Sequence, residues 1–142
     1  MKKLPKITLG RPHSWREWEY SAICMLTGGI GYGLLEVLWR GYTHISMIVT
    51  GGVCLTAISL INRKLKRGPF LHRCLICTAF VITAEFFVGI LVNRILHLCV
   101  WDYSASRFNL LGQICLEFSF IWFLLCLLIS LAMSLAFRKE RV

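Results

Sequence analysis

The longest apolar run in the chain reads LLGQICLEFSFIWFLLCLLISLAMSLAF and extends from about Leu110 to Phe137. A helix of about 20 apolar residues crosses the hydrocarbon core of a bilayer. Three other runs of that length lie at about Tyr20 to Trp39, Thr43 to Ile61 and Leu71 to Ile95. Because a spanning segment must satisfy its own backbone hydrogen bonds, we expect an all-α membrane protein with four transmembrane helices.

The composition agrees with a membrane protein. The chain has 142 residues, of which 57% are hydrophobic, and its mean hydropathy is +0.68. A soluble domain of this size could not cover so much apolar side chain with polar surface. No polar stretch is long enough for a separate domain, so residues 1–142 are predicted to form one integral membrane domain. Residues 1–19 read as a basic cytoplasmic segment rather than a cleaved signal peptide, with a short interfacial helix around Trp15 and Trp18.

The basic residues are distributed unevenly between the two ends of the predicted helices. Thirteen of the 16 Lys and Arg residues lie before the first span, between the second and third, or after the fourth. Only Arg40, Arg94 and Arg107 lie at the opposite ends. The positive-inside rule then predicts two helical hairpins with both termini in the cytoplasm. The net charge of +9 records this topology and contact with lipid headgroups, and nucleic-acid binding is not predicted.

The seven cysteines fall almost entirely within apolar runs, where a thiol behaves as a small hydrophobic group. Cys74 and Cys77 have CxxC spacing, but no second pair or histidine cluster accompanies them, so neither a metal site nor another cofactor is predicted. Cys99 and Cys115 lie near the predicted outer face. They are either structural thiols, the reading we favour, or partners in a disulfide.

Glycines are dense in the first two spans. Gly29 and Gly33 have the small-xxx-small spacing that lets membrane helices approach closely. The 142 residues contain no Walker motif, so they do not predict ATP hydrolysis through a P-loop. The two hairpins also share an order of features: a glutamate, a basic residue, and then GGVCL (51–55) or GQICL (112–116) opening or continuing the return helix. This order suggests a direct repeat.

Acidic residues inside the predicted spans are the main functional signal. Glu36, Glu85 and Glu117 would be costly in lipid unless they are paired or hydrated. One interpretation is an outward-facing polar cavity, completed by Gln113 and Arg107, that binds a small solute, an ion or a lipid headgroup. The alternative is ion pairing of Glu36 with Arg40 and of Glu85 with Arg94. The candidate binding residues are Glu36, Arg40, Glu85, Asn93, Arg94, Trp101, Asp102, Tyr103, Ser104, Asn109 and Glu117.

The stretch VWDYSASRFN (100–109) is unusually polar for a connection between spans. It contains Trp101, Asp102 and Tyr103, and we expect it to fold back over Glu85 and Glu36. Its capping residues, Asp102 and Asn109, would serve equally well in a plain connection that re-enters the fourth span.

Three stretches resemble a known family: GGIGYGLLEVLWRG (28–41), AEFFVGILVN (84–93) and, above all, WDYSASRFNLLGQICLEFSFIW (101–122). They resemble the bacterial CmpB-like membrane proteins called putative ABC-transporter type IV. The chain departs from the expected pattern at Arg107, where we expect Pro, and at Glu117, where we expect Lys or a small residue. The positions matching the family pattern are Glu36, Glu85, Trp101, Asp102, Tyr103, Ser104, Asn109 and Gly112.

The resemblance implies a permease-type subunit in the bacterial cytoplasmic membrane. Such a subunit would recruit a separate ATPase, with the basic stretch NRKLKR (62–67) as a candidate contact. Four helices form a thin wall around any cavity, so we also expect a homo-oligomer or other membrane subunits.

The sequence is therefore compatible with three functions. The first is a transport component, which in a proton-coupled form would use Glu36 or Glu85 as the titrating group. The second is a non-catalytic membrane partner whose polar cluster is an assembly interface. The third is a membrane-embedded enzyme acting on a lipid or envelope substrate, with Asp102 or Glu85 as general base. The sequence contains no P-loop, metal cluster or nucleophile triad, so an enzyme is the least favoured.

Overall fold

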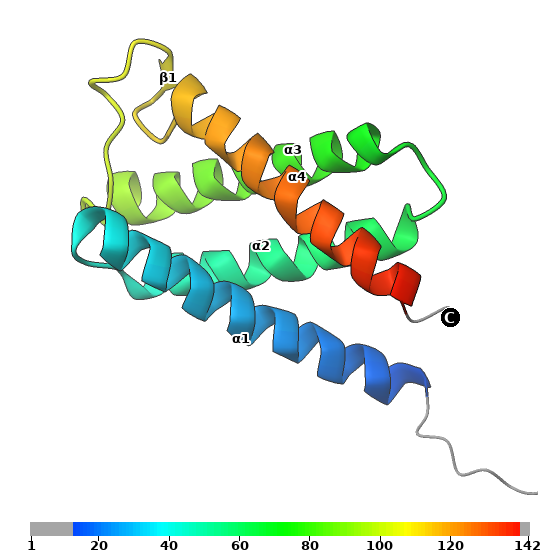
Figure 1. The fold of residues 1–142 in the computed structure, drawn as a ribbon. Coiled ribbons are helices and arrows are strands. Elements are labelled where there is room, and N and C mark those ends of the chain that lie inside the picture. The colour runs from blue at the N-terminus through cyan, green and yellow to red at the C-terminus, as the bar shows by residue number, and fades with distance from the viewer. Residues whose placement is uncertain (1–12, 140–142) are drawn as a thin grey trace, which may run out of the picture.

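The structure is a computed structural model that describes residues 13–139, with side chains described from 16 to 136. Four helices make up most of it: α1 (His13–Arg40), α2 (Ile45–Lys64), α3 (Phe70–Gly89) and α4 (Leu116–Lys139) (Figure 1). α3 continues into a π-helical segment, η1 (Ile90–Ile95), and a small hairpin of β1 (Asn109–Leu110) and β2 (Ile114–Cys115) precedes α4.

Four of the described helices are long and apolar enough to cross a membrane, over residues 16–40, 45–64, 70–95 and 116–136. The prediction of an all-α protein with four such helices is therefore confirmed, and the chain is a multi-pass membrane protein. The turn between α1 and α2 and the connecting segment (residues 96–115) lie at one end of the bundle (Figure 1). We call this the connector end. The start of α1, the α2–α3 loop and the end of α4 lie at the other end.

The first span and the segment before it form one continuous helix. α1 begins at His13, so Trp15 and Trp18 lie in its first turns and not in a separate interfacial helix. No Pro or Gly occurs between His13 and Thr27 to interrupt the helix.

The fourth helix starts six residues later than the sequence predicted. Residues from Leu110 to Cys115 are apolar, but they form the β1–β2 hairpin, which reverses at Leu111 (φ 53°) and Gly112 (φ 69°). The Gly112 amide donates to Asn109 Oδ1 at 3.0 Å, which fixes this turn. Glu117 consequently lies in the first turn of α4, with an exposed side chain.

The β1–β2 hairpin also removes the correspondence on which the predicted repeat was based. GGVCL (51–55) lies in the middle of α2, whereas GQICL (112–116) lies mainly in the turn and β2, before α4. The two pentapeptides therefore occupy different structural positions, and the predicted correspondence between the return helices is wrong.

Glycines bring α1 and α2 into close contact, as the sequence predicted. A Cβ atom on Gly28 would lie 2.6 Å from the Gly51 carbonyl oxygen, and one on Gly29 would lie 2.8 Å from the Ile48 carbonyl oxygen. Neither backbone oxygen can move aside without moving its helix, so these positions require glycine for the observed packing.

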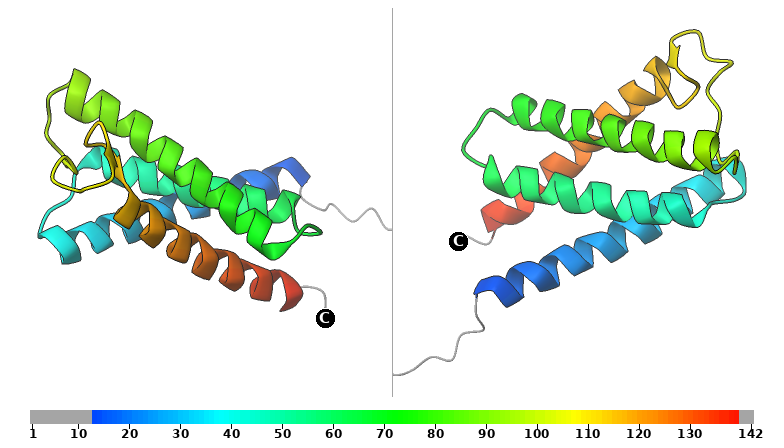
Figure 2. Two further views of the ribbon diagram at one scale, coloured as in Figure 1. Left: turned by 90° about the horizontal axis from the view of Figure 1, so that it is seen from above. Right: turned by 180° about the vertical axis from the view of Figure 1, so that it is seen from behind.

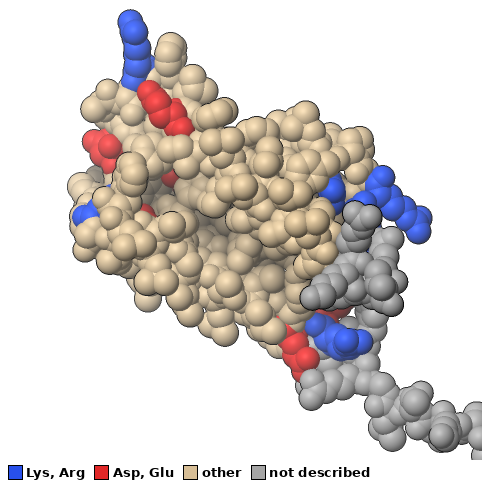
Figure 3. All heavy atoms as spheres, in the orientation of Figure 1, with Lys and Arg blue, Asp and Glu red and all other residues tan. Residues whose placement is uncertain are grey.

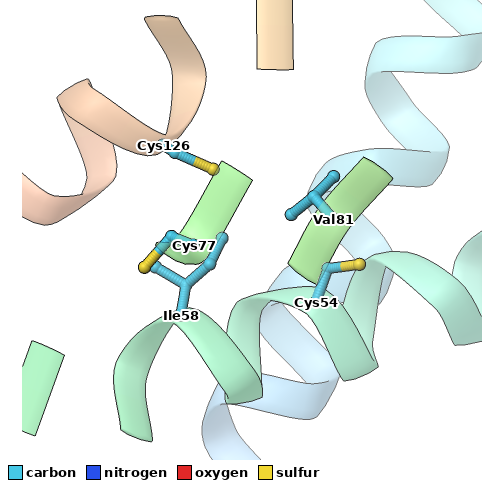
Figure 4. Close-up of a cluster of buried hydrophobic side chains, with 5 residues drawn as sticks. All are labelled: Cys54, Ile58, Cys77, Val81 and Cys126. Carbon is cyan, nitrogen blue, oxygen red and sulfur yellow. The ribbon is translucent and has the colours of Figure 1, made fainter. Parts of the chain in front are cut away.

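The core between α2, α3 and α4 is built from small apolar and sulfur-containing side chains. Figure 4 shows Cys54 and Ile58 of α2 facing Cys77 and Val81 of α3, with Cys126 of α4 beside them. All seven cysteines are unpaired, and those within the helices are buried. The described residues contain no group of three or more His, Cys, Asp or Glu side chains arranged to hold a metal ion.

A buried polar network joins the same three helices near the α2–α3 loop. Asn62 of α2 is fully buried, and its Nδ2 donates to Ser130 Oγ of α4 at 2.9 Å. Arg73 of α3 donates to Asn62 Oδ1 and to Ser134 Oγ of α4, each at 3.4 Å. These hydrogen bonds satisfy polar groups that lipid could not, and they hold α4 against α2 and α3.

Candidate functional site

The last turn of α1 carries a buried ion pair. Glu36 is 8% exposed, accepts a charge-assisted hydrogen bond from the Arg40 guanidinium, and accepts another from Thr43 Oγ1 at 2.6 Å. Residues four apart share a helix face, which explains why Glu36 and Arg40 meet. The predicted pairing of these two residues is confirmed. Arg40 also donates to the Val100 carbonyl oxygen at 2.8 Å and so connects α1 to the connecting segment.

Glu85 of α3 is buried differently. It is 3% exposed, and its carboxylate accepts hydrogen bonds from Trp122 Nε1 at 2.7 Å and from the Tyr103 hydroxyl at 3.3 Å. The predicted ion pair with Arg94 does not form, because Arg94 lies nine residues further along, is exposed, and donates to the Leu111 carbonyl oxygen. Among the side chains that the structure describes, none forms a salt bridge with Glu85.

Aromatic rings surround the Glu85 carboxylate. Tyr32 of α1 stacks on Trp122 of α4 with ring centroids 5.5 Å apart, and Tyr103 stacks on Phe118 of α4 at 4.7 Å. Trp122 and Tyr103 are also the two donors to Glu85. The carboxylate thus lies where rings from α1, α4 and the connecting segment meet.

The connecting segment is held to η1 by the amide side chains of Asn93 and Gln113. Asn93 Oδ1 accepts from the Val100 amide at 2.7 Å, and Asn93 Nδ2 donates to Gln113 Oε1 at 2.9 Å. Trp101 Nε1 donates to the Gln113 carbonyl oxygen at 2.9 Å. Since these contacts fix the segment on both sides of Tyr103, they position its hydroxyl over Glu85. The prediction that this stretch folds back over Glu85 is confirmed by the Tyr103 contact, whereas on the Glu36 side the stretch contacts Arg40, through the Val100 carbonyl oxygen.

The outer part of the segment is stabilised by its own polar side chains. Asp102 Oδ1 accepts from both the hydroxyl and the backbone amide of Ser104, and these hydrogen bonds lower the pKa of Asp102. Asn109 Nδ2 donates to the Ser106 carbonyl oxygen at 2.7 Å. The pKa of Tyr103, by contrast, is raised, chiefly by burial and then by the nearby Glu85 carboxylate.

Two adjoining hollows lie between α1 and α4. The first, of about 320 Å³, lies toward the connector end, and Glu36, Arg40, Trp101 and Tyr103 are among its lining residues. The second, of about 230 Å³, is lined by Glu85 and otherwise almost entirely by apolar side chains and glycines of all four helices. They share lining residues, namely Tyr32, Leu35, Met47, Trp122 and Leu125.

We call the two hollows together the α1–α4 groove. Figure 3 shows one hollowed face of the molecule with acidic atoms visible inside it. The views in Figure 2 place α2 and α3 side by side, with α1 alongside α2 and α4 crossing one face of the α2–α3 pair. α2 and α3 therefore contribute the inner wall of the groove, through residues such as Met47 and Val81.

A comparison with protein families identifies the family of this chain. The family model described as Putative ABC-transporter type IV matches residues 30–140, a range that includes both buried glutamates and the whole connecting segment. The chain belongs to the putative ABC-transporter type IV family. No solved structure matches it.

In this member of the putative ABC-transporter type IV family, the predicted site residues fall into two groups. Glu36, Arg40, Glu85, Trp101 and Tyr103 line the groove. The others do not line the groove. Asn93 accepts a hydrogen bond from the connecting segment, and Glu117 is exposed on α4. The remaining four are exposed at or near the connecting segment: Arg94, Asp102, Ser104 and Asn109.

Sequence reasoning missed three aromatic residues of this type IV family protein: Tyr32, Phe118 and Trp122. Each lies within an apolar run and reads as an ordinary lipid-facing or core side chain. Trp122 carried a usable signal, because an indole N–H in the middle of a span needs an acceptor that lipid cannot supply. That acceptor is Glu85.

Proposed function

We propose that this protein is the membrane-embedded component of a transporter and that its α1–α4 groove binds a small solute or the headgroup of a lipid-like molecule. Membership of the putative ABC-transporter type IV family supports transport. The observation that carries the proposal is the polarity of the groove. Its connector-end hollow holds the Glu36 carboxylate and the Arg40 guanidinium, and the adjoining hollow holds Glu85, whereas Leu55, Leu125 and Ile129 make the rest of the groove apolar. Such a groove suits a molecule with a polar head and an apolar body.

We further propose that the connector end faces away from the cytoplasm and that both termini are cytoplasmic. The uneven distribution of Lys and Arg supports this orientation, because 13 of the 16 precede the first span, lie between the second and third, or follow the fourth. The groove would then open to the exterior or to the outer leaflet of a bacterial cell membrane.

We also propose that the protein works with a separate ATPase and with a further membrane subunit. These 142 residues contain no Walker motif, so an ABC-type mechanism requires a separate ATPase. The exposed Lys64, Lys66 and Arg67 of the α2–α3 region are the surface we assign to that contact. A second copy of the chain, or another membrane subunit, would complete the wall of the groove. Copurification from native membranes identifies both kinds of partner.

Gly31 provides a direct test of the groove. It lines the groove on α1, and a Cβ atom built on it would meet nothing within 4 Å. Gly31→Leu therefore fills groove space without forcing the helices apart. We expect this variant, expressed in its native cell in place of the wild-type chain, to reproduce the defect of a deletion. Untargeted mass spectrometry of the membranes and of the medium measures that defect as a change, relative to wild-type cells, in how one compound is distributed between the two.

The matched control is Ala79→Leu, on an exposed face of α3 that does not line the groove. It adds the same side chain in contact with lipid and should restore the wild-type distribution. A Gly31→Leu variant that behaves like wild type would overturn the proposal. So would a deletion whose effect is a chemically altered compound, because that result indicates an enzyme.

A further inference from the structure

The charges at the two buried glutamates are balanced differently. Glu36 has a cationic partner, Arg40, whose guanidinium is also held by the Val100 carbonyl oxygen. Glu85 has two neutral donors, an indole and a phenol, and no salt bridge to any side chain that the structure describes. A buried carboxylate is stable in its charged form only beside a compensating charge, and otherwise it holds a proton. The groove wall thus presents two carboxylates and one guanidinium, so with both acids ionised one negative charge is left uncompensated.

The side chains around Glu85 are suited to a cation. Tyr32, Trp101, Tyr103, Phe118 and Trp122 all line the connector-end hollow, and Tyr32 and Trp122 also line the hollow that contains Glu85. Tyr32 stacks on Trp122, and Tyr103 stacks on Phe118. The negative face of an aromatic ring attracts an ammonium group, most strongly where water is excluded.

Other ligand classes fit this wall less well. An anion would meet Glu36 and Glu85, and the guanidinium that could hold it, Arg40, already donates to Glu36 and to Val100. A metal ion would require several hard or nitrogen ligands, and the described residues offer no group of three. The apolar remainder of the groove, with Leu55, Leu125 and Ile129, favours a ligand that carries a hydrocarbon part.

We propose that the α1–α4 groove binds an organic ammonium ion with an apolar tail. The ammonium head lies where the two hollows meet, between Glu85 and the rings of Tyr32 and Trp122, and the tail lies along the apolar part of the groove. This inference rests on the proposed function of the groove and names its ligand class. Such a head occurs both in a bilayer lipid that carries choline or ethanolamine and in a free amphiphilic amine.

The test compares two probes of equal chain length, hexyltrimethylammonium and hexyl phosphate, binding to the protein in lipid nanodiscs. Calorimetry should show saturable binding of the ammonium probe and weaker or no binding of the phosphate. Glu85→Gln keeps the size of the side chain and an acceptor for Trp122 but removes the charge. It should weaken ammonium binding about tenfold or more. Glu117→Gln removes an exposed carboxylate of α4 and should leave the affinity unchanged.

The ring contribution is tested separately. Tyr32→Phe keeps the ring, whereas Tyr32→Leu removes it, so only the second should weaken ammonium binding.

The two sources of the ligand are distinguished by the nanodisc lipid. If the natural ligand is a bilayer lipid, then phosphatidylethanolamine or phosphatidylcholine will compete with the probe and phosphatidylglycerol will not. If it is a free amine, the difference in affinity between wild type and Glu85→Gln will be the same in all three lipids.

The failure of this inference can be told apart from the failure of the proposed function. If the two probes bind equally and Gly31→Leu weakens both, the groove binds ligands but does not select a cation, and the inference is overturned. If Gly31→Leu affects neither probe, the groove itself is not a binding site. Unchanged ammonium binding by a folded Glu85→Gln variant, verified by its circular dichroism spectrum, also overturns the assignment.

Discussion

Two glycines of α1, three positions apart, have opposite surroundings. Gly28 faces α2 so closely that an added Cβ would lie 2.6 Å from both the Gly51 carbonyl oxygen and Leu55 Cβ. Gly31 faces open space in the groove. The same residue type therefore serves helix packing at one position and groove volume at the other.

This contrast predicts a difference in stability. Gly28→Ala should destabilise the protein by about 2 kcal/mol, because overpacking a helix contact forces the backbones apart. Gly31→Ala should leave the free energy of unfolding within about 1 kcal/mol of wild type or raise it, since alanine favours a helix. Unfolding titrations in mixed detergent micelles measure both. Equal effects of the two substitutions would contradict the α1–α2 packing described here.

At the scale of elements, the connecting segment has a buried inner layer and an exposed outer layer, and different kinds of hydrogen bond stabilise the two. Its inner layer, Trp101 and Gln113, is buried, and its hydrogen bonds, from Trp101 to the Gln113 carbonyl oxygen and from Asn93 of η1 to Gln113 Oε1, do not depend on charge. Its outer layer depends partly on the Asp102 carboxylate, which accepts from Ser104.

The outer layer should therefore loosen in acid. The pKa of Asp102 is lower in the folded chain than the value of about 3.9 for a free aspartate. A lowered pKa means that the carboxylate stabilises the segment fully above that ordinary value. The stabilisation is lost as the pH falls through the lower, folded-state pKa. The rate of backbone amide hydrogen exchange in residues 102–109, corrected for the intrinsic rate, should therefore rise in the wild type as the pH falls from the ordinary pKa through the folded-state pKa.

Asp102→Asn supplies the comparison for the acid experiment. Asparagine cannot titrate there, so the variant should show no acid-dependent rise in exchange beyond that of the rest of the bundle. Glu117→Gln should keep the wild-type profile, because Glu117 lies on α4 outside the segment. An unchanged acid response in Asp102→Asn would assign the effect to another group.

The sequence allowed the four long helices to be predicted, but not every boundary between them. Run length and hydropathy suffice for a helix that crosses lipid. They failed at residues 110–115, because Leu110, Ile114 and Cys115 are as apolar as the helix that follows, whereas the hairpin is set by Asn109 and Gly112. A hydropathy pattern carries no information about a left-handed turn.

The candidate site was predictable only in part, for a related reason. Intramembrane acids are recognisable from their cost in lipid, so Glu36 and Glu85 could be identified. Their partners could not be, because Tyr103 and Trp122 reach Glu85 across 18 and 37 residues of chain. Arg94 was wrongly paired with Glu85, because nine residues are about two and a half turns of a regular helix and place the two side chains on opposite faces.

At the scale of the whole molecule, a single cysteine reports the proposed orientation. Cys99 is exposed at the connector end, whereas the other six cysteines are buried. If that end faces outward, a membrane-impermeant maleimide should label the protein in intact cells, and Cys99→Ser should abolish the labelling. Mass spectrometry of the purified chain detects the adduct. Labelling that requires permeabilised cells would instead place the connector end in the cytoplasm.

The tight α1–α2 contact has a consequence for how this protein can diversify. Gly28, Gly29 and Gly51 admit almost no substitution, because any side chain there meets the backbone or the Cβ of the facing helix. Across the groove, Leu125 and Ile129 of α4 present ordinary aliphatic side chains that many others could replace. We therefore expect natural variation in ligand preference to accumulate on α4 and the connecting segment, while the α1–α2 hairpin stays constant.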